Sequence, residues 1–188
     1  MINLKIISGT DRPNSNALRV STYVQRKYSQ EGVSADIIDL QDFPLDQVVG
    51  GKYGKELPAV DNFVKQAVTS DGLVVVCPEY NGGYPGILKI FIDYLPFPNS
   101  LNKKPIALIG EANGAFGAMR AVEQLQQVFG YRNAHIFPER VFISRVNDNF
   151  DDEEGIKDQF QHQLLKDQIN GFPDFVRNLQ GDESVITD

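Results

Sequence analysis

Apolar residues occur along this chain in two alternating patterns. Short runs that are apolar on consecutive positions, such as GLVVVC at 72–77, are typical of strands covered on both faces of a sheet. The predicted strands lie at 2–7, 34–39, 72–77, 105–110 and 140–144. After each strand the apolar positions recur at helical spacing. The predicted helices lie at 16–30, 58–70, 85–95, 117–129 and 155–179.

Regular alternation of strands and helices predicts an α/β fold, with a parallel sheet between two layers of helices. No internal repeat or linker divides the 188 residues, a length that suits one domain. We therefore expect a single domain at 1–180 and a frayed tail at 181–188. The longer polar segment at 43–58 is expected to form a loop.

The composition is that of an ordinary globular protein, with 41% apolar and 23% charged residues. No apolar run approaches the roughly 20 residues of a membrane span, and the N-terminus lacks the features of a signal peptide. The single cysteine, Cys77, excludes an internal disulfide. We therefore expect a cytoplasmic protein.

The net charge of −7 opposes attraction to nucleic acid or to an anionic membrane. Much of the acidity lies in NDNFDDEEGIKD at 147–158. Its carboxylates are consecutive and lack the alternating spacing of a calcium loop. We interpret this run as a solvated loop and helix start, and we expect no metal site.

In a parallel sheet of this kind, ligands bind beyond the carboxyl ends of the strands. The first loop at that edge, SGTDRPNSNALRV at 8–20, combines Gly9, suited to a tight turn, with Ser15 or Asn16 as a helix cap. A helix N-terminus attracts anions, and the loop lacks the glycine pattern of a nucleotide motif and the cysteine of a phosphatase. It predicts phosphate binding without chemistry on the phosphate. The alternative is an ordinary capped helix after a turn.

The second loop, CPEYNGGYPG at 77–86, is longer and more elaborate than a strand-to-helix connection requires. Its two adjacent glycines permit close approach of the backbone to a ligand, and Tyr80 and Tyr84 offer flat faces. Glu79 is interpreted more simply as a surface carboxylate, and Cys77 as a small buried residue.

The third loop, GEANGAFGAMRAVEQL at 110–125, is rich in small residues. Gly114 and Gly117 suit a planar ligand that lies against the backbone, or they merely ease a bend into the next helix. Together, the three loops suit a planar ring that carries a phosphate.

Two segments resemble the signature segments of the NADPH-dependent FMN reductase family. GTDRPNS at 9–15 is short and moderately specific, whereas PEYNGGYPGILKIFID at 78–93 is long and highly specific. The order of elements is similar over nearly the whole chain. The resemblance implies a flavodoxin-like three-layer sandwich, with a five-stranded parallel sheet in the order 2-1-3-4-5 and helices on both faces.

The resemblance also implies which residues bind FMN. Those that would hold the phosphate are Thr10, Arg12, Ser15, Asn16 and Ala17. Those that would contact the ring and ribityl chain, largely through the backbone, are Pro78, Glu79, Tyr80, Asn81 and Gly82. Asn113 and Gly114 would flank the ring. The chain departs from many relatives in reading Glu111, Ala112, Asn113 where they carry a hydroxyl residue, which bears on flavin affinity and potential.

The implied function is that of an FMN-dependent NAD(P)H oxidoreductase. Hydride would pass from a nicotinamide to bound FMN, and electrons then to a small acceptor such as a quinone, azo compound or flavin. No catalytic side chain is needed. The alternatives are an FMN electron carrier without pyridine-nucleotide activity and a flavin-free binding protein. The sequence distinguishes neither NADPH from NADH nor one acceptor from another.

The helix predicted at 85–95 favours self-association. GILKIFIDYLPF at 86–97 is apolar around most of its circumference, apart from Lys89 and Asp93. A second subunit is the simplest cover for such a helix, and the family resemblance implies the same. We therefore expect a homodimer or a dimer of dimers, with the flavin near the subunit boundary. In the alternative, the 43–58 loop covers Phe91 or Tyr94.

Overall fold

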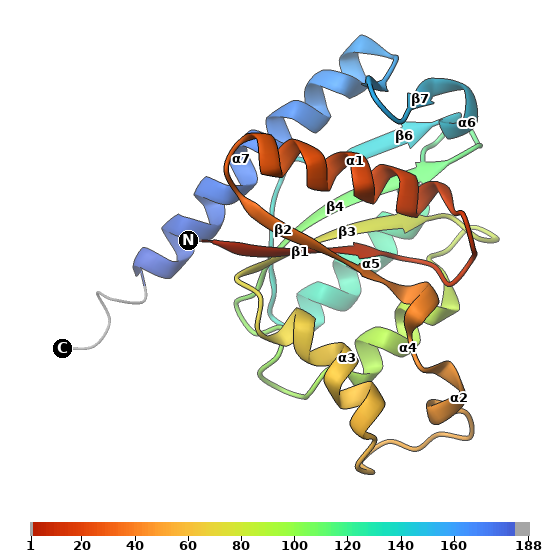
Figure 1. The fold of residues 1–188 in the computed structure, drawn as a ribbon, viewed down its shortest axis with the longest axis vertical. Coiled ribbons are helices and arrows are strands. Elements are labelled where there is room, and N and C mark those ends of the chain that lie inside the picture. Colours follow the sequence, from red (N-terminus) through yellow and green to blue (C-terminus); the bar gives the residue numbers. More distant parts are fainter. Residues whose placement is uncertain (1, 183–188) are drawn as a thin grey trace.

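The computed structural model describes residues 2–182 and contains one main sheet of parallel strands (Figure 1). Its strands are β1 (Asn3–Ser8), β2 (Ser34–Asp39), β3 (Gly72–Pro78), β4 (Pro105–Ala112), β5 (His135–Ile136) and β6 (Val141–Ser144). The order is β2-β1-β3-β4-β5, and β6 also pairs with β4. The predicted flavodoxin-like strand order is therefore confirmed.

The fifth strand position is divided between two short strands. β5 pairs with Pro105 and Ile106 at the start of β4, and β6 pairs with 109–112 at its end. The predicted strand at 140–144 is therefore only part of this edge. Pro138 lies between the two strands, and a proline has no N–H to continue the ladder.

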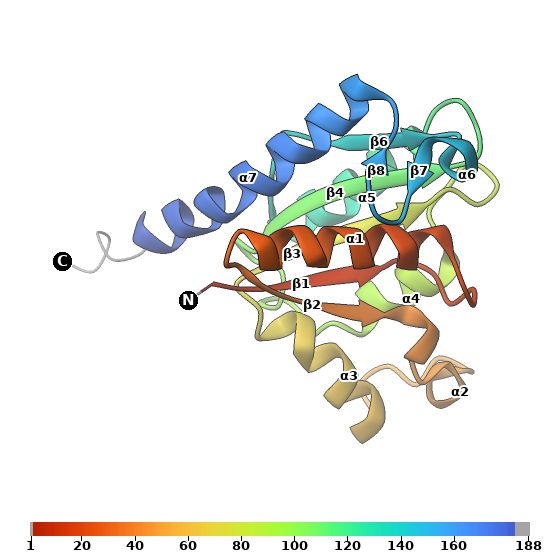
Figure 2. The ribbon, with the colours of Figure 1, turned by 45° about the horizontal axis from the view of Figure 1, so that its top comes forward.

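Two helical layers cover the sheet (Figures 1 and 2). One face is covered by α1 (Asn16–Gln30) and α7 (Gln159–Asp182), and the other by α3 (Pro58–Val68), α4 (Gly86–Tyr94) and α5 (Met119–Tyr131). All of β3 is buried. Val74 and Val76 pack toward α1 and α7, whereas Leu73, Val75 and Cys77 pack toward the other layer, because successive side chains of a strand point to opposite faces.

Several short elements lie in segments predicted as loops or helix. The 43–58 segment contains α2 (Leu45–Val48), which follows the 3₁₀ turn η1 (Leu40–Asp42). After β6 come the short helix α6 (Val146–Asn149) and an antiparallel hairpin of β7 (Phe150–Asp151) and β8 (Gly155–Ile156). The prediction that the last helix starts at 155 is wrong, because 155–156 belong to this hairpin.

The acidic run at 147–158 is attached to α1 rather than simply solvated. Arg19 donates to Asp152 at 2.8 Å, and Arg26 pairs with Glu153 at 3.0 Å. The last helix then begins at Gln159, where the Asp158 carboxylate accepts a hydrogen bond from the Gln161 N–H at 2.9 Å. The hairpin therefore joins the two helices on one face of the sheet.

The apolar helix α4 is largely covered within the chain. Phe91 is fully buried and makes edge contacts with Phe43 and Phe63, with ring centroids 6.2 and 6.1 Å away. Tyr94 stacks on Tyr53 with centroids 4.7 Å apart. The alternative interpretation, in which the 43–58 loop covers these side chains, is therefore correct for both, since Phe43 and Tyr53 belong to that loop.

Helix α7 extends to Asp182, two residues past the predicted domain boundary, and 183–188 lie outside the described residues. Within residues 2–182, no helix has the length and apolar character needed to cross a membrane.

Candidate functional site

A cavity of about 560 Å³ lies beyond the carboxyl ends of β3 and β4, beside the loop that follows β1. These strand ends are on the right in Figure 1. The cavity is lined by Arg12, Asn14, Ser15, Asn16, Pro78, Glu79, Tyr80, Glu111, Ala112, Asn113, Gly114 and Asn147. All three loops singled out in the sequence contribute to it.

The loop after β1 is fixed to the neighbouring strand. The Gly9 N–H donates to the Val76 carbonyl at 2.9 Å, and a Cβ on Gly9 would lie only 2.6 Å from that oxygen. Glycine is therefore needed here for close packing. Thr10 is fully buried, and its Oγ1 lies 2.7 Å from the Tyr80 hydroxyl. This hydrogen bond joins the first loop to the second.

The N-terminus of α1 opens toward the cavity. Ser15 caps the helix, and its Oγ accepts a hydrogen bond from the Leu18 N–H at 3.1 Å. The N–H groups of Asn16 and Ala17, at the first two helical positions, have no partner within the helix. The Arg12 guanidinium lies 4.9 Å from the centre of the Tyr80 ring. This end of the cavity therefore concentrates positive charge and hydrogen-bond donors.

The second loop contains a tight turn. Tyr80 and Gly83 exchange two backbone hydrogen bonds of 2.8 and 3.1 Å, and Asn81 and Gly82 between them have φ values of 53° and 80°. Positive φ at both central residues defines a type I′ turn, which Asn-Gly favours. The Gln124 side chain donates to the Gly82 carbonyl at 3.1 Å. The turn therefore holds Tyr80 in place, while Asn81 and Gly82 do not line the cavity.

The interpretation of Glu79 as a surface carboxylate is wrong. Its side chain is only 9% exposed, and its Oε1 accepts a hydrogen bond of 2.9 Å from Arg120 Nε. Its Oε2 is buried without a hydrogen-bond partner among the described residues. Arg120 therefore fixes Glu79 at the cavity wall through one carboxylate oxygen.

The glycines of the third loop have different roles. A Cβ on Gly117, which has a φ of +54°, would lie 2.7 Å from the backbone carbon of Phe142. A Cβ on Gly114 would meet nothing within 4 Å. Gly117 is thus needed for packing against β6, whereas Gly114 leaves open space at the cavity.

Glu111, at the end of β4, lines the cavity although it was not predicted to bind a ligand. It is 4% exposed. Burial raises the pKa of its carboxyl from 4.5 to about 7, although Arg19 and Arg12 act in the opposite direction. In the sequence, Glu111 was marked only by its departure from the hydroxyl residue that many relatives carry in this loop.

Asn147 is a further lining residue that sequence reasoning missed. Its N–H donates to Asn113 Oδ1 at 3.1 Å, and its side-chain oxygen accepts from Asn16 Nδ2 at 2.8 Å. It therefore connects the first and third loops. Of the predicted residues, Thr10 and Ala17 are buried behind the cavity wall and do not line it.

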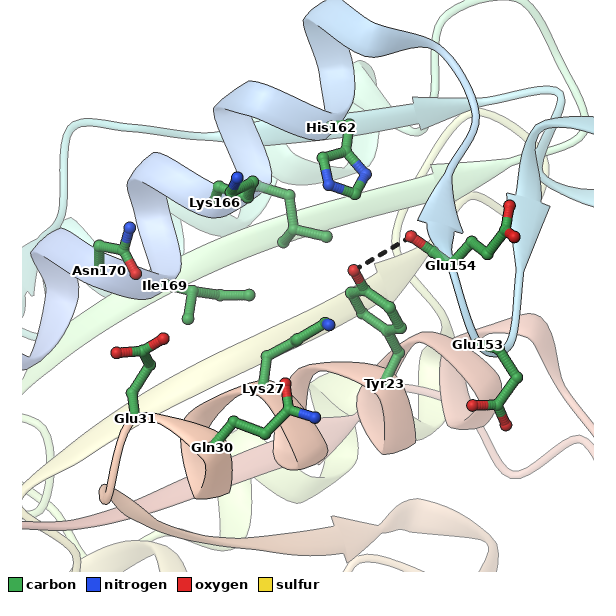
Figure 3. Close-up of a pocket in the computed structure, with 11 residues that line it drawn as sticks. Tyr23, Lys27, Gln30, Glu31, Glu153, Glu154, His162, Lys166, Ile169 and Asn170 are labelled. Carbon is green, nitrogen blue, oxygen red and sulfur yellow. Dashed lines mark hydrogen bonds between the residues drawn. The ribbon is translucent and has the colours of Figure 1, made fainter.

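A second cavity, of about 300 Å³, lies between α1, the β7–β8 hairpin and α7 (Figure 3). Lys27 and Lys166 share it with Glu31, Glu153 and Glu154. Charges of both signs surround it, and none of the predicted site residues lines it. The cavity at the ends of β3 and β4 is therefore the candidate site.

The sheet order, the helical layers and the position of the cavity define a flavodoxin-like protein. The chain belongs to the NADPH-dependent FMN reductase family, whose sequence model matches residues 2–148.

Individual relatives agree with this assignment. The chain is 30% identical over 159 residues to an NAD(P)H-dependent FMN reductase of Pseudomonas aeruginosa. The aligned region covers 80% of this chain and 82% of the relative. It is 29% identical over 116 residues to an FMN-dependent NADPH-azoreductase of Staphylococcus aureus. That alignment covers 58% of this chain and 60% of the azoreductase.

Solved structures share the fold. The NAD(P)H:(acceptor) oxidoreductase FerB of Paracoccus denitrificans has a TM-score of 0.76 at 20% identity, over 95% of this chain and 98% of that one. An NADH:FMN oxidoreductase has a TM-score of 0.74 at 20% identity, over 92% and 88% of the two chains.

Proposed function

We propose that this protein is an FMN-dependent NAD(P)H oxidoreductase, with FMN in the cavity at the ends of β3 and β4. The observation that carries the proposal is one cavity that combines phosphate-binding and ring-binding groups, in a chain of the FMN reductase family. The helix N–H groups and Arg12 lie beside the aromatic Tyr80, and the backbone at Gly114 borders open space. A volume of about 560 Å³ also suits a bound cofactor.

The first loop would bind the phosphate of FMN. Arg12 would supply charge-assisted hydrogen bonds, and the N–H groups of Asn16 and Ala17 would add the field of the helix N-terminus. Ser15 and Thr10 would support this arrangement. Ser15 caps the helix, and Thr10 fixes the loop against Tyr80.

The second and third loops would hold the ring and ribityl chain. Pro78 and Tyr80 supply an apolar and aromatic wall, and the unpartnered Oε2 of Glu79 would accept a hydrogen bond from the cofactor. Asn113 and Gly114 would flank the ring from the opposite side. Asn81 and Gly82 would act through the turn that positions Tyr80.

When bound, FMN supplies the redox chemistry, accepting a hydride from NADPH or NADH and passing electrons to a quinone, azo compound or flavin. The residues of this chain would bind and orient it. Cys77 is not suited to nucleophilic catalysis, because burial strongly raises the pKa of its thiol and the nearby Glu111 and Glu79 raise it further.

A homodimer or dimer of dimers in the cytoplasm is part of this proposal. Phe91 and Tyr94 are already covered by the chain, so the proposed dimer now depends on the partly exposed Ile90 of α4 and on exposed apolar side chains of the 43–58 segment such as Val49, which is 67% exposed. A second subunit on α4 would cover this surface.

Two measurements test the enzymatic proposal. The purified protein should bind added FMN and show its flavin absorbance bands, and it should oxidise NADPH or NADH when a quinone is present. FMN binding without nucleotide oxidation would indicate an electron carrier instead. Failure to bind FMN would refute the proposed function.

A further inference from the structure

A buried acid lies in the same cavity as the proposed phosphate site. Glu111 pairs in register with Pro78 of β3 and Ile143 of β6, so it occupies the interior of the sheet edge that bounds the cavity. It is 96% buried, and among residues 2–182 no group hydrogen-bonds to its carboxylate. A buried carboxylate normally has such partners, so its isolation at a ligand cavity requires an explanation.

The surrounding charges do not neutralise it by direct contact. Arg19 of α1 donates instead to Asp152 at 2.8 Å and to Asn16 at 2.7 Å. Arg12, from the loop after β1, lies against the Tyr80 ring. Both arginines still attract the carboxylate electrostatically.

On the β3 side the nearby groups supply no compensating positive charge to Glu111. The Cys77 thiol is buried, and it is close enough to Glu111 and Glu79 for both carboxylates to raise its pKa. Glu79 is a second acid, engaged with Arg120. From β6 the register neighbour is the apolar Ile143. Burial disfavours the charged form of Glu111, and the resulting pKa of about 7 makes both forms accessible near neutral pH.

We propose that Glu111 makes FMN binding depend on pH: the cofactor is bound tightly while this carboxyl is protonated and is released more readily once it ionises. The inference rests on the proposed FMN site. A phosphate monoester carries a charge of about −1.5 to −2 at pH 7. An ionised Glu111 would place a second anion in the same cavity and would compete with the phosphate for the attraction of Arg12. A protonated Glu111 would remove that repulsion and offer a hydrogen-bond donor.

The direction of the pH dependence follows from the coupling between proton binding at Glu111 and FMN binding. Since bound phosphate favours the protonated form, the pKa of Glu111 should be higher in the complex than in the free protein. The contribution of Glu111 to FMN affinity should then be constant below pH 7. Affinity should fall as the pH rises from about 7, the pKa of Glu111 in the free protein, to the higher pKa of Glu111 in the complex. A rise of one pKa unit corresponds to about a tenfold loss of affinity.

The test compares FMN dissociation constants of the wild type and Glu111→Gln between pH 6.5 and 9, measured by flavin fluorescence. The wild type should lose about tenfold or more in affinity over this range, and Glu111→Gln should lose much less. Asp11→Asn is the matched control, because Asp11 is an exposed acid in the first loop. It should keep the wild-type profile. Riboflavin, which has no phosphate, should show a weaker dependence.

A second measurement does not depend on any variant. Titration calorimetry of the wild type at pH 7.5, in buffers of different ionisation enthalpy, should show net proton uptake when FMN binds. Parallel pH profiles for wild type and Glu111→Gln, or the absence of proton uptake, would overturn the role of Glu111 while leaving the FMN site intact. A wild type that binds no FMN at any pH would overturn the proposed function and this inference with it.

Discussion

At the residue scale, Glu111 also links the stability of the free protein to pH. Its carboxyl has a pKa of about 7 in the folded chain, compared with an ordinary value of 4.5. Between these values the folded protein binds more protons than the unfolded chain, so the free energy of unfolding decreases as pH rises from 4.5 to about 7 and then levels off. This difference corresponds to roughly 3 kcal/mol.

Glu111→Gln should therefore stabilise the FMN-free protein at pH 8. Glutamine has nearly the same shape but no charge to bury, so we expect a gain of about 2–3 kcal/mol. At pH 4.5 the gain should shrink to less than about 1 kcal/mol. Urea denaturation at the two pH values measures both quantities. A gain that is the same at both values would show that charge burial is not its cause.

The combined substitution Arg12→Ala and Ser15→Ala should weaken FMN binding without unfolding the protein. Each charge-assisted hydrogen bond contributes roughly 1.5–3 kcal/mol, so affinity should fall on the order of a hundredfold or more. Loss of the Ser15 cap should reduce stability by only about 1 kcal/mol. Fluorescence titration with FMN measures the affinity. Arg26→Ala, which removes a charge beside Glu153 instead, should bind FMN normally, and unchanged affinity in the double variant would place the phosphate elsewhere.

At the element scale, the third loop contains two glycines with different roles: Gly117 is needed for packing, whereas Gly114 borders open space. Gly117→Ala should destabilise the protein by about 1–3 kcal/mol, since its Cβ would meet the β6 backbone at a positive φ. Gly114→Ala should fold normally but bind FMN more weakly, because its methyl group would project where the cofactor is proposed to lie. Thermal unfolding and FMN titration of both variants test this. Equal stability losses would contradict the distinction.

The elements were predictable where one local pattern decided them. The strand at 34–39 and the helix at 16–30 have the predicted bounds, since turn residues and a serine cap mark their limits. The hairpin of β7 and β8 was missed because its strands have only two residues each and depend on contacts with α1. The divided edge was missed because the apolar residues around Pro138 are distributed over two short strands.

The site was also predictable only in part, because the sequence shows local patterns but not contacts between distant residues. The first two loops carry local signals, namely a helix cap in the first and adjacent glycines with two tyrosines in the second, and these indicated Ser15 and Tyr80. Asn147 reaches the cavity only through the folding of α6 against Asn16, 131 positions earlier in the chain. The burial of Glu79 depends on Arg120 from α5, and no local pattern indicates this pair.

At the scale of the whole molecule, we expect a dimer of 21.0 kDa chains, or a tetramer, in solution. Ile90→Glu should dissociate the oligomer, because a charge would be buried against the second subunit. Since the flavin is expected near the subunit boundary, dissociation should also weaken FMN binding. Light scattering with FMN titration tests both effects. Phe160→Glu is the control, since Phe160 is 73% exposed at the start of α7, on the other face of the sheet. A monomeric wild type that binds FMN fully would refute a flavin site that depends on the second subunit.

The divided edge of the sheet limits how copies of this protein can meet. β5 has two residues and β6 has four, and Pro138 separates them. In the gap, the Gln168 side chain donates to the carbonyls of Leu108 and Glu139 at 3.0 and 2.7 Å. A strand from another molecule would find no continuous row of free backbone groups there. This border of the sheet is therefore protected against the strand-by-strand growth that leads to fibrils.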